Sequence, residues 1–203
     1  MYAPDAFIAA DPAAIVRTYP FAVFSTWSAG QLFATCTPLF FESPDSVATL
    51  VGHLARVNPH AQAMESGQPV LATFNGPHTY ISSSWYRARP SVPTWNYVAA
   101  QVRGRLEPID DAAQQLEILR HSAAITEADA AAPWTLEHAP PGRIDALLPR
   151  IRAFRVHVED ISGVTKLSQI QPPSDWPLII RELLQRRDPQ STEIARLMSL
   201  LIE

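Results

Sequence analysis

The stretch FNGPHTYISSSWYRARPSVPTWNY, residues 74–97, carries the most unusual run of side chains in the chain. It holds two of the five tryptophans, three of the five tyrosines, three consecutive serines and three prolines. Asn-Gly and Gly-Pro pairs favour turns, because glycine adopts positive φ freely and proline fixes its own φ. The stretch therefore predicts a strand ending at residue 74, a turn at 75–77, a strand over 79–86, a loop over 87–93 and a strand from 94.

Aromatic rings and hydroxyl groups alternate closely within this stretch. Such a mixture suits the wall of a pocket for a flat ligand with polar edges. It also suits the interior of a barrel, because aromatic residues dominate ordinary protein cores. The residues alone leave both interpretations open.

The composition is that of a globular protein with one large domain, or one domain and a small appendage. Of 203 residues, 47% are hydrophobic and 18% are charged, so a full core can form. The net charge of −4 argues against a general nucleic-acid surface, which needs a basic footprint. The opening residues do not resemble a signal peptide, and no apolar run could span a bilayer. We therefore expect a cytoplasmic protein without membrane contact.

Alternation of apolar and polar residues predicts a mainly antiparallel sheet, with strands over 21–27, 31–41, 47–54, 70–74, 98–106 and 151–161. Capping residues followed by proline predict helices starting after Asp11 and Asn58, and Asp110 is the expected cap of a third helix. Further helices are expected over 143–148, 176–187 and 191–202, and a surface excursion over 126–141. These elements indicate an α+β, mainly β fold: an antiparallel barrel with inserted and C-terminal helices.

The segment HLARVNP, residues 53–59, is the best candidate for binding an anion. A strand ends here and a capped helix begins, so unpaired backbone N–H groups and the positive end of the helix dipole face outward. His53 and Arg56 add side-chain donors that suit a phosphate group. Thr35 and Thr37 share one face of an earlier strand and could serve a ligand together.

The segment KLSQ, residues 166–169, is a second candidate. If it is extended, Lys166 and Ser168 place a cation and a hydroxyl on one side. The histidines at 53, 60 and 78 show no metal-ligand spacing, and the single cysteine, Cys36, excludes a cysteine-based zinc site. No glycine-rich phosphate loop and no nucleophile elbow is present. We therefore expect neither a metal site nor catalytic residues.

Four stretches resemble the FMN-binding negative transcriptional regulators of the PaiB type. They are GHLARVNP at 52–59, FNGPHTYISSSWY at 74–86, VPTWNY at 92–97 and KLSQ at 166–169, and the opening MYAPDAF is also similar. The likeness extends in order over residues 1–169. Ser84 stands where the family often has proline, and Ile170 stands where it often has asparagine.

The resemblance implies an FMN-binding split antiparallel β-barrel that forms a homodimer, with FMN near the subunit interface. Residues 1–170 would form the barrel and residues 171–203 a C-terminal helical extension. The implied contacts to the phosphate are His53, Arg56 and Asn58, and those to the phosphate or ribityl chain, from either subunit, are Lys166, Ser168 and Gln169. The implied neighbours of the flavin ring are Thr35, Thr37, Tyr80, Ser82, Trp85, Trp95 and Asn96.

Two functions follow from the resemblance. The first is an FMN-binding regulator that represses transcription as a homodimer, with contact to promoter DNA. The second is an FMN-dependent oxidoreductase on the same barrel, for which His78 is the only candidate acid. A haem-binding barrel with His53 or His78 as axial ligand ranks last, because the phosphate-type residues would then have no role.

Overall fold

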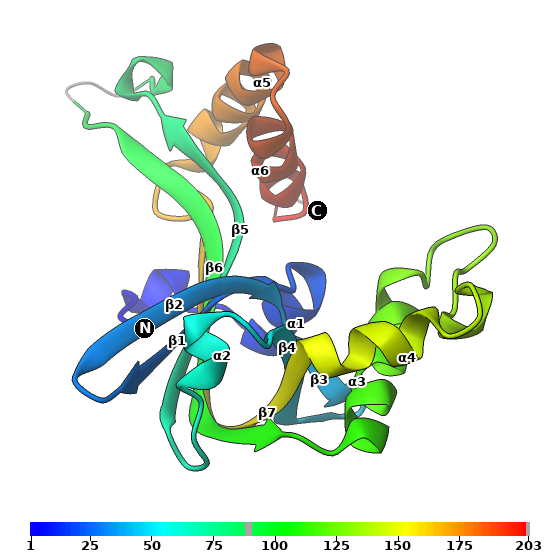
Figure 1. The fold of residues 1–203 in the computed structure, drawn as a ribbon. Coiled ribbons are helices and arrows are strands. Elements are labelled where there is room, and N and C mark those ends of the chain that lie inside the picture. The colour runs from blue at the N-terminus through cyan, green and yellow to red at the C-terminus, as the bar shows by residue number, and fades with distance from the viewer. Residues whose placement is uncertain (88–90, 202–203) are drawn as a thin grey trace. The chain divides into compact units, whose positions relative to one another are not determined.

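The computed structural model describes residues 1–87 and 91–201, which form a mainly β fold with helices (Figure 1). Seven strands make one sheet in the order β2-β1-β5-β6-β7-β4-β3. The strands are β1 (Phe21–Ser28), β2 (Gln31–Pro38), β3 (Phe40–Ser43), β4 (Ser46–Ala55), β5 (Pro69–Ile81), β6 (Thr94–Ile109) and β7 (Ile151–Lys166). Within the described residues the end strands β2 and β3 do not pair with each other, so the sheet is open. The predicted α+β, mainly β fold class is confirmed.

The helices are α1 (Pro12–Thr18), α2 (Pro59–Gln62), α3 (Ala112–Thr126), α4 (Arg143–Leu147), α5 (Trp176–Arg186) and α6 (Pro189–Ser199). Helices α1, α2, α3 and α6 begin after a residue whose side chain caps them. In α1, α2 and α6 a proline occupies the first turn, and the preceding Asp or Asn accepts a backbone N–H. Among the described residues, none of the helices has the length and apolar character needed to cross a membrane.

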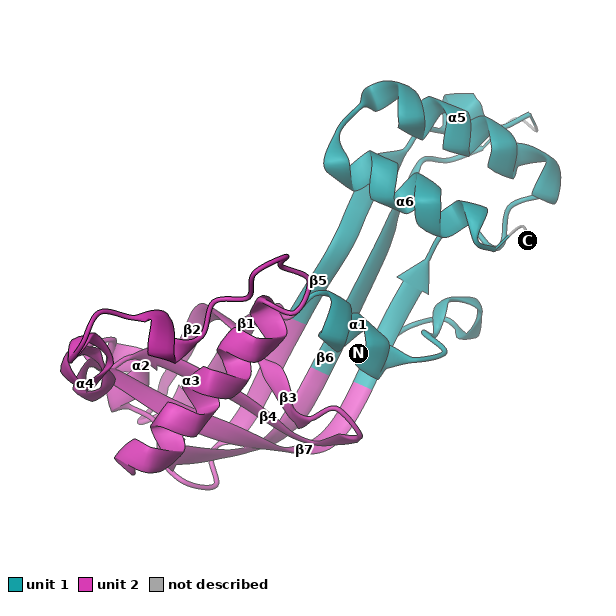
Figure 2. Cartoon of the chain, turned by 90° about the vertical axis from the view of Figure 1, so that its right-hand side faces the viewer, with its two compact units in different colours: residues 1–19, 74–101, 162–203 teal, residues 20–73, 102–161 magenta. Residues whose placement is uncertain are grey.

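The chain packs as two compact units, coloured separately in Figure 2. Unit 1 comprises residues 1–19, 74–101 and 162–203, and unit 2 comprises residues 20–73 and 102–161. Strands β5, β6 and β7 each contribute residues to both units. The predicted boundary at residue 170 remains a prediction.

Unit 2 is built on the hairpin of β1 and β2, which are joined by Ala29 and Gly30. Both residues have positive φ, the geometry of a type I′ turn, and this matches the right-handed twist of the strands. Phe24 of β1 stacks on Phe154 of β7, with ring centroids 4.5 Å apart. On another part of the sheet, helix α3 places Ile118 in a buried cluster with residues of β3, β4, β6 and β7.

Unit 1 pairs helices α5 and α6, whose inner side chains are buried: Ile179, Leu183, Ile194 and Met198. These helices also satisfy the backbone of β5. The N–H of His78 donates to Gln190 Oε1 at 3.0 Å, and the carbonyl of Tyr80 accepts from Arg186 Nη1 at 2.9 Å. Covering strand backbone groups in this way prevents pairing with another chain's strand.

The predicted turn at residues 75–77 is wrong, because β5 runs without interruption from Pro69 to Ile81. Gly76 does not have positive φ. A Cβ at this position would lie 2.9 Å from the ring of Tyr19 and 3.1 Å from the carbonyl oxygen of Val98. Glycine is therefore required for close packing and not for chain reversal. The next predicted strand, 79–86, is also too long, because residues 83–85 form a 3₁₀ turn.

Smaller differences have local causes. The strand predicted over 31–41 is divided into β2 and β3 after Pro38, which has no backbone N–H to continue the ladder. Asp111, and not Asp110, caps α3 by accepting the N–H of Gln114 at 2.9 Å. The predicted loop over 87–93 falls partly on residues 88–90, and the predicted helix end at 202 falls on residues 202–203; both lie outside the described residues.

Gly76→Ala should lower the free energy of unfolding by about 1–3 kcal/mol, because the new methyl group overpacks against Tyr19. Urea unfolding measures this change. In a Tyr19→Ala background the cost of Gly76→Ala should shrink, since the ring it meets is gone. An equal cost in both backgrounds would show that the Tyr19 contact is not the reason for glycine.

Candidate functional site

The predicted site residues fall into two groups. Unit 2 holds Thr35, Thr37, His53, Arg56 and Asn58. Unit 1 holds Tyr80, Ser82, Trp85, Trp95, Asn96, Lys166, Ser168 and Gln169. The structure brings members of each group together, and each group is described by itself.

In unit 2 the strand β4 ends at Ala55, and Arg56 is held at the corner that leads to α2. Its Nε donates to the carbonyl oxygens of Pro149 at 3.1 Å and Ile151 at 3.0 Å. Its Nη1 forms an ion pair with Asp110 at 3.1 Å, while 40% of the side chain stays exposed. The guanidinium is therefore fixed in direction and open on one side, which suits an incoming anion.

Asp110 joins this corner to the start of β7. Arg152 Nη2 lies 3.0 Å from its carboxylate, and Arg152 Nη1 also donates to the carbonyls of Ala61 and Met64 beside α2. Hydrogen bonds from Arg152 and Arg56 hold the pKa of Asp110 below its usual value. Asp110, the expected cap of α3, instead forms ion pairs with two arginines.

Helix α2 itself contributes little to the attraction of an anion. It has four residues, so its dipole is small, and its cap Asn58 accepts the N–H of His60 at 2.9 Å. Among the predicted phosphate contacts of unit 2, Arg56 is therefore the one that carries a positive charge.

His60 is a buried residue that sequence reasoning did not single out as part of the site. It is 2% exposed and stacks on Phe24, with ring centroids 4.8 Å apart. Its Nε2 lies 3.0 Å from Thr26 Oγ1, and its Nδ1 lies 2.9 Å from Thr35 Oγ1. Burial lowers the pKa of His60 to about 4, so the ring is neutral at pH 7. Thr26 and Thr35 lie on adjacent strands far from His60 in sequence, so no sequence signal joins these three residues.

The two threonines of β2 are both bonded within the protein. Thr35 contacts His60, and the hydroxyl of Thr37 donates to the backbone carbonyl of His53 at 3.0 Å. His53 lines a mainly apolar cavity, and burial lowers the pKa of its imidazole. A neutral imidazole offers a phosphate no charge. The flavin contacts of Thr35, Thr37 and His53 remain predictions.

In unit 1 three rings from β5 and β6 form an exposed group. Trp95 is 54% exposed, Tyr80 meets it edge to face at 6.1 Å, and His78 lies 6.3 Å away. His78 and Trp95 also line a cavity of about 420 Å³ together with Asn75 and Tyr97. This open aromatic face is the part of unit 1 best suited to contact a flat ring.

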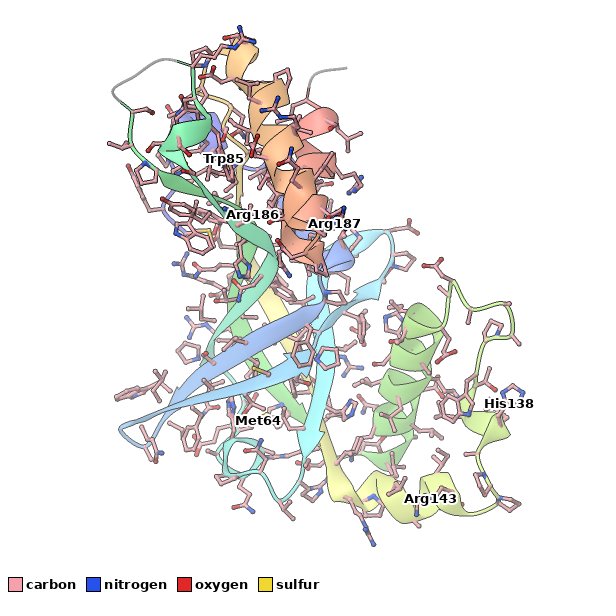
Figure 3. All side chains as sticks on the ribbon, turned by 90° about the horizontal axis from the view of Figure 1, so that it is seen from above. Met64, Trp85, His138, Arg143, Arg186 and Arg187 are labelled. Atoms are coloured by element: carbon pink, nitrogen blue, oxygen red, sulfur yellow. The ribbon has the colours of Figure 1, made fainter. Side chains whose placement is uncertain are left out.

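Ser82 and Trp85 serve local packing. Ser82 caps the 3₁₀ turn over 83–85 by accepting the N–H of Ser84 at 3.2 Å. The guanidinium of Arg186 lies 4.7 Å from the ring centre of Trp85, and Figure 3 shows the two side chains near each other. This cation–π contact fastens the end of β5 to helix α5.

The KLSQ segment leaves strand β7 after Lys166 and forms a turn, so the extended arrangement that would put Lys166 and Ser168 on one side does not occur. Ser168 has a φ of 64°, and its hydroxyl hydrogen-bonds the side-chain amide of Asn96 in a fully buried pair. Gln169 accepts the N–H of Leu167 at 2.6 Å. Lys166 Nζ donates to Thr94 at 2.7 Å and remains partly exposed. Of this segment, Lys166 is best placed to meet a ligand.

A metal centre finds no support in the parts of the chain that are described: residues 1–87 and 91–201 contain no group of three or more His, Cys, Asp or Glu side chains able to hold an ion.

Comparison with known proteins gives a consistent result. The model of the family described as "Putative FMN-binding domain" matches residues 1–160. The chain is 34% identical to "Protease synthase and sporulation protein PAI 2" of Bacillus subtilis over 203 residues, covering 98% of this chain and 96% of that one.

Two solved structures share the fold. The flavocytochrome Anf3 from Azotobacter vinelandii superposes with a TM-score of 0.62 at 18% identity, covering 84% of this chain and 74% of its own. The FAD and heme binding protein from Mycobacterium smegmatis superposes with a TM-score of 0.51 at 18% identity. The match covers 75% of this chain and 68% of that protein's chain. At this level of identity the likeness concerns the fold alone.

His60 should make stability pH-dependent. Its pKa is about 4 in the folded protein against about 6.5 unfolded, so the folded state binds fewer protons between these values. The contribution of His60 to the free energy of unfolding is then fully present above about pH 6.5. It is lost as the pH falls toward 4, by up to about 3 kcal/mol. Urea unfolding at pH 7, 5.5 and 4.5 measures the loss.

A His60→Gln variant is the control, because it keeps hydrogen-bonding groups without titrating in this range. Its stability should fall less over the same interval, with His53 still contributing to both proteins. Identical pH profiles for the two proteins would contradict the assigned role of His60.

Proposed function

The chain belongs to the family of FMN-binding domains whose model matches it, and from that membership we propose that it acts as a homodimeric, FMN-binding negative transcriptional regulator of the PaiB type. FMN is the cofactor of this family. The observation that carries the proposal is the similarity to the Bacillus subtilis protein along nearly the whole of both chains.

The donor groups of unit 2 fit the phosphate of FMN. Arg56 would hold the phosphate, because its guanidinium is fixed by backbone carbonyls and Asp110 yet keeps an exposed side. The side-chain amide of Asn58 lies at the same corner, 3.5 Å from the Thr35 hydroxyl, and supplies a neutral donor. The ion pair with Asp110 restricts the orientation of the Arg56 side chain. The carboxylate also reduces the net positive charge at this corner.

The exposed rings of unit 1 fit the flavin ring system. Trp95 and Tyr80 present open aromatic surface, on which a planar heterocycle can stack. Lys166 adds a partly exposed cation in the same unit. When bound, FMN supplies a ring that accepts and releases electrons. We propose each group as a cofactor-contacting surface in its own right.

The remaining predicted residues act as supports in this proposal. Asn96 and Ser168 bond to each other in the interior, and Gln169 closes the turn that follows β7. Ser82 and Trp85 fix the end of β5 against α5. These contacts position the strands that carry Tyr80, Trp95 and Lys166.

An FMN-dependent oxidoreductase is the second candidate, and one observation favours it. His78 is exposed and lines the same cavity as Trp95, so a proton donor stands beside the rings proposed to meet the flavin. Anaerobic reduction of the bound FMN by NADH or NADPH, followed by transfer to an added acceptor, separates this function from a regulator that only binds flavin.

Arg56→Ala should weaken FMN binding by about 1–3 kcal/mol, the usual cost of losing a charge-assisted hydrogen bond. Quenching of flavin fluorescence on titration measures the affinity. Arg152→Ala is the matched control, because Arg152 also pairs with Asp110 and bonds to backbone carbonyls but is not a proposed phosphate ligand. Equal losses of affinity in both variants would mean that Arg56 acts only through structure.

The regulatory role predicts a dimer that retards an upstream promoter fragment in a gel shift. Light scattering gives the mass of the complex, and the salt dependence of the affinity reports the number of phosphates contacted. A scrambled fragment of equal length is the control. Binding that does not distinguish the two fragments would contradict the regulator proposal and leave FMN binding intact.

A further inference from the structure

Unit 2 contains a cavity of about 420 Å³ that neither the phosphate corner nor the exposed rings account for. Strands β3 and β4 form one side, through Phe40 and His53. Helix α3 and the segment around α4 form the other, through Leu119 and Leu148. Its size and mainly apolar lining match those of typical small-molecule pockets.

The outer wall of this cavity is the excursion between α3 and α4, marked by His138 and Arg143 in Figure 3. Trp134 and Leu136 from this segment line the cavity, and Leu136 is buried. Two contacts fix the segment to α3. The N–H of Trp134 donates to Glu127 at 3.1 Å, and Glu137 pairs with Arg120 at 3.1 Å. The excursion is therefore a built wall and not a loose surface loop.

The polar groups of the cavity are few and specific. No lysine or arginine lines it among the described residues, and its one carboxylate, Glu127, already accepts the Trp134 N–H. His53 is one of the residues that line the cavity, and no hydrogen bond in the described parts of the chain involves its ring nitrogens. Burial lowers the pKa of His53 and keeps the ring uncharged. An anion would find no positive charge here.

We propose that this cavity binds a small, uncharged, mainly apolar molecule that makes one hydrogen bond to the imidazole of His53. Apolar walls remove the body of such a ligand from water, and the unpartnered ring nitrogen supplies a single directional contact. The phosphate of FMN does not suit this cavity, because its lining among residues 1–87 and 91–201 includes a carboxylate and neither lysine nor arginine. The inference goes beyond the proposed function and does not depend on it.

Two fluorescent probes of the same skeleton test the proposal. N-phenyl-1-naphthylamine is uncharged with one N–H group, and 8-anilino-1-naphthalenesulfonate adds one negative charge. We expect the uncharged probe to bind the full-length protein at one site, at least tenfold tighter than the sulfonate. Equal affinity, or tighter binding of the sulfonate, would overturn the proposal.

Variants then locate the site. Ala123→Phe should fill the cavity and lower the affinity for the uncharged probe at least tenfold. Ala113→Phe, at an exposed position on the same helix, should change the affinity for this probe less than twofold. Leu148→Trp fills the cavity from the segment around α4 and serves if Ala123→Phe does not fold. Binding that survives both filling variants would place the probe elsewhere and overturn the proposal.

His53→Leu keeps a side chain of similar volume and removes the hydrogen bond, so the affinity for the uncharged probe should fall about threefold to tenfold. FMN titrated into the complex should leave the probe bound. Displacement of the probe by FMN at one-to-one stoichiometry, or a haem Soret band that depends on His53, would assign the cavity to a cofactor and refute an uncharged ligand. Loss of FMN affinity with retained probe binding would instead count against the proposed function alone.

Discussion

A buried imidazole held between two threonine hydroxyls is the contact on which the corner of unit 2 depends. His60 joins β1 through Thr26, β2 through Thr35 and the first turn of α2. A neutral imidazole has one donor and one acceptor, and a hydroxyl can play either part, so both tautomers are satisfied. Leaving either nitrogen unpaired in this interior would cost about 1–3 kcal/mol. Because His60 fixes α2, it also fixes the approach to Asn58 and Arg56.

Charge at this corner is arranged around a single carboxylate. Asp110 pairs with both Arg56 and Arg152, and the two arginines also donate to backbone carbonyls. Such partly exposed pairs add little stability individually, but they restrict the direction of a guanidinium. A restricted donor loses less entropy when it binds an anion, which is the benefit of preorganisation. The same residue can therefore serve the fold and the ligand.

Much of this structure follows from local sequence pattern. Alternation located the strands, and the Asp-Pro and Asn-Pro pairs located the starts of α1 and α2, because these signals act within a few residues. The turn predicted at Gly76 is wrong because glycine is needed there for close packing against Tyr19. That tyrosine lies 57 positions earlier in the chain, so the neighbouring residues do not reveal the contact. Asn96 and Ser168 lie 72 residues apart, and no local rule could show that they satisfy each other. The family resemblance identified the cofactor, whereas the cavity walled by Trp134 and Leu136 becomes visible only in three dimensions.

We propose above all that the phosphate of FMN is recognised at a corner where Arg56 is the principal cation. Titration of the protein with FMN and with riboflavin, which has the same ring but no phosphate, tests it most directly. The account predicts that FMN binds at least tenfold tighter than riboflavin and that added salt narrows the difference. Equal affinity for the two flavins at low salt would contradict it.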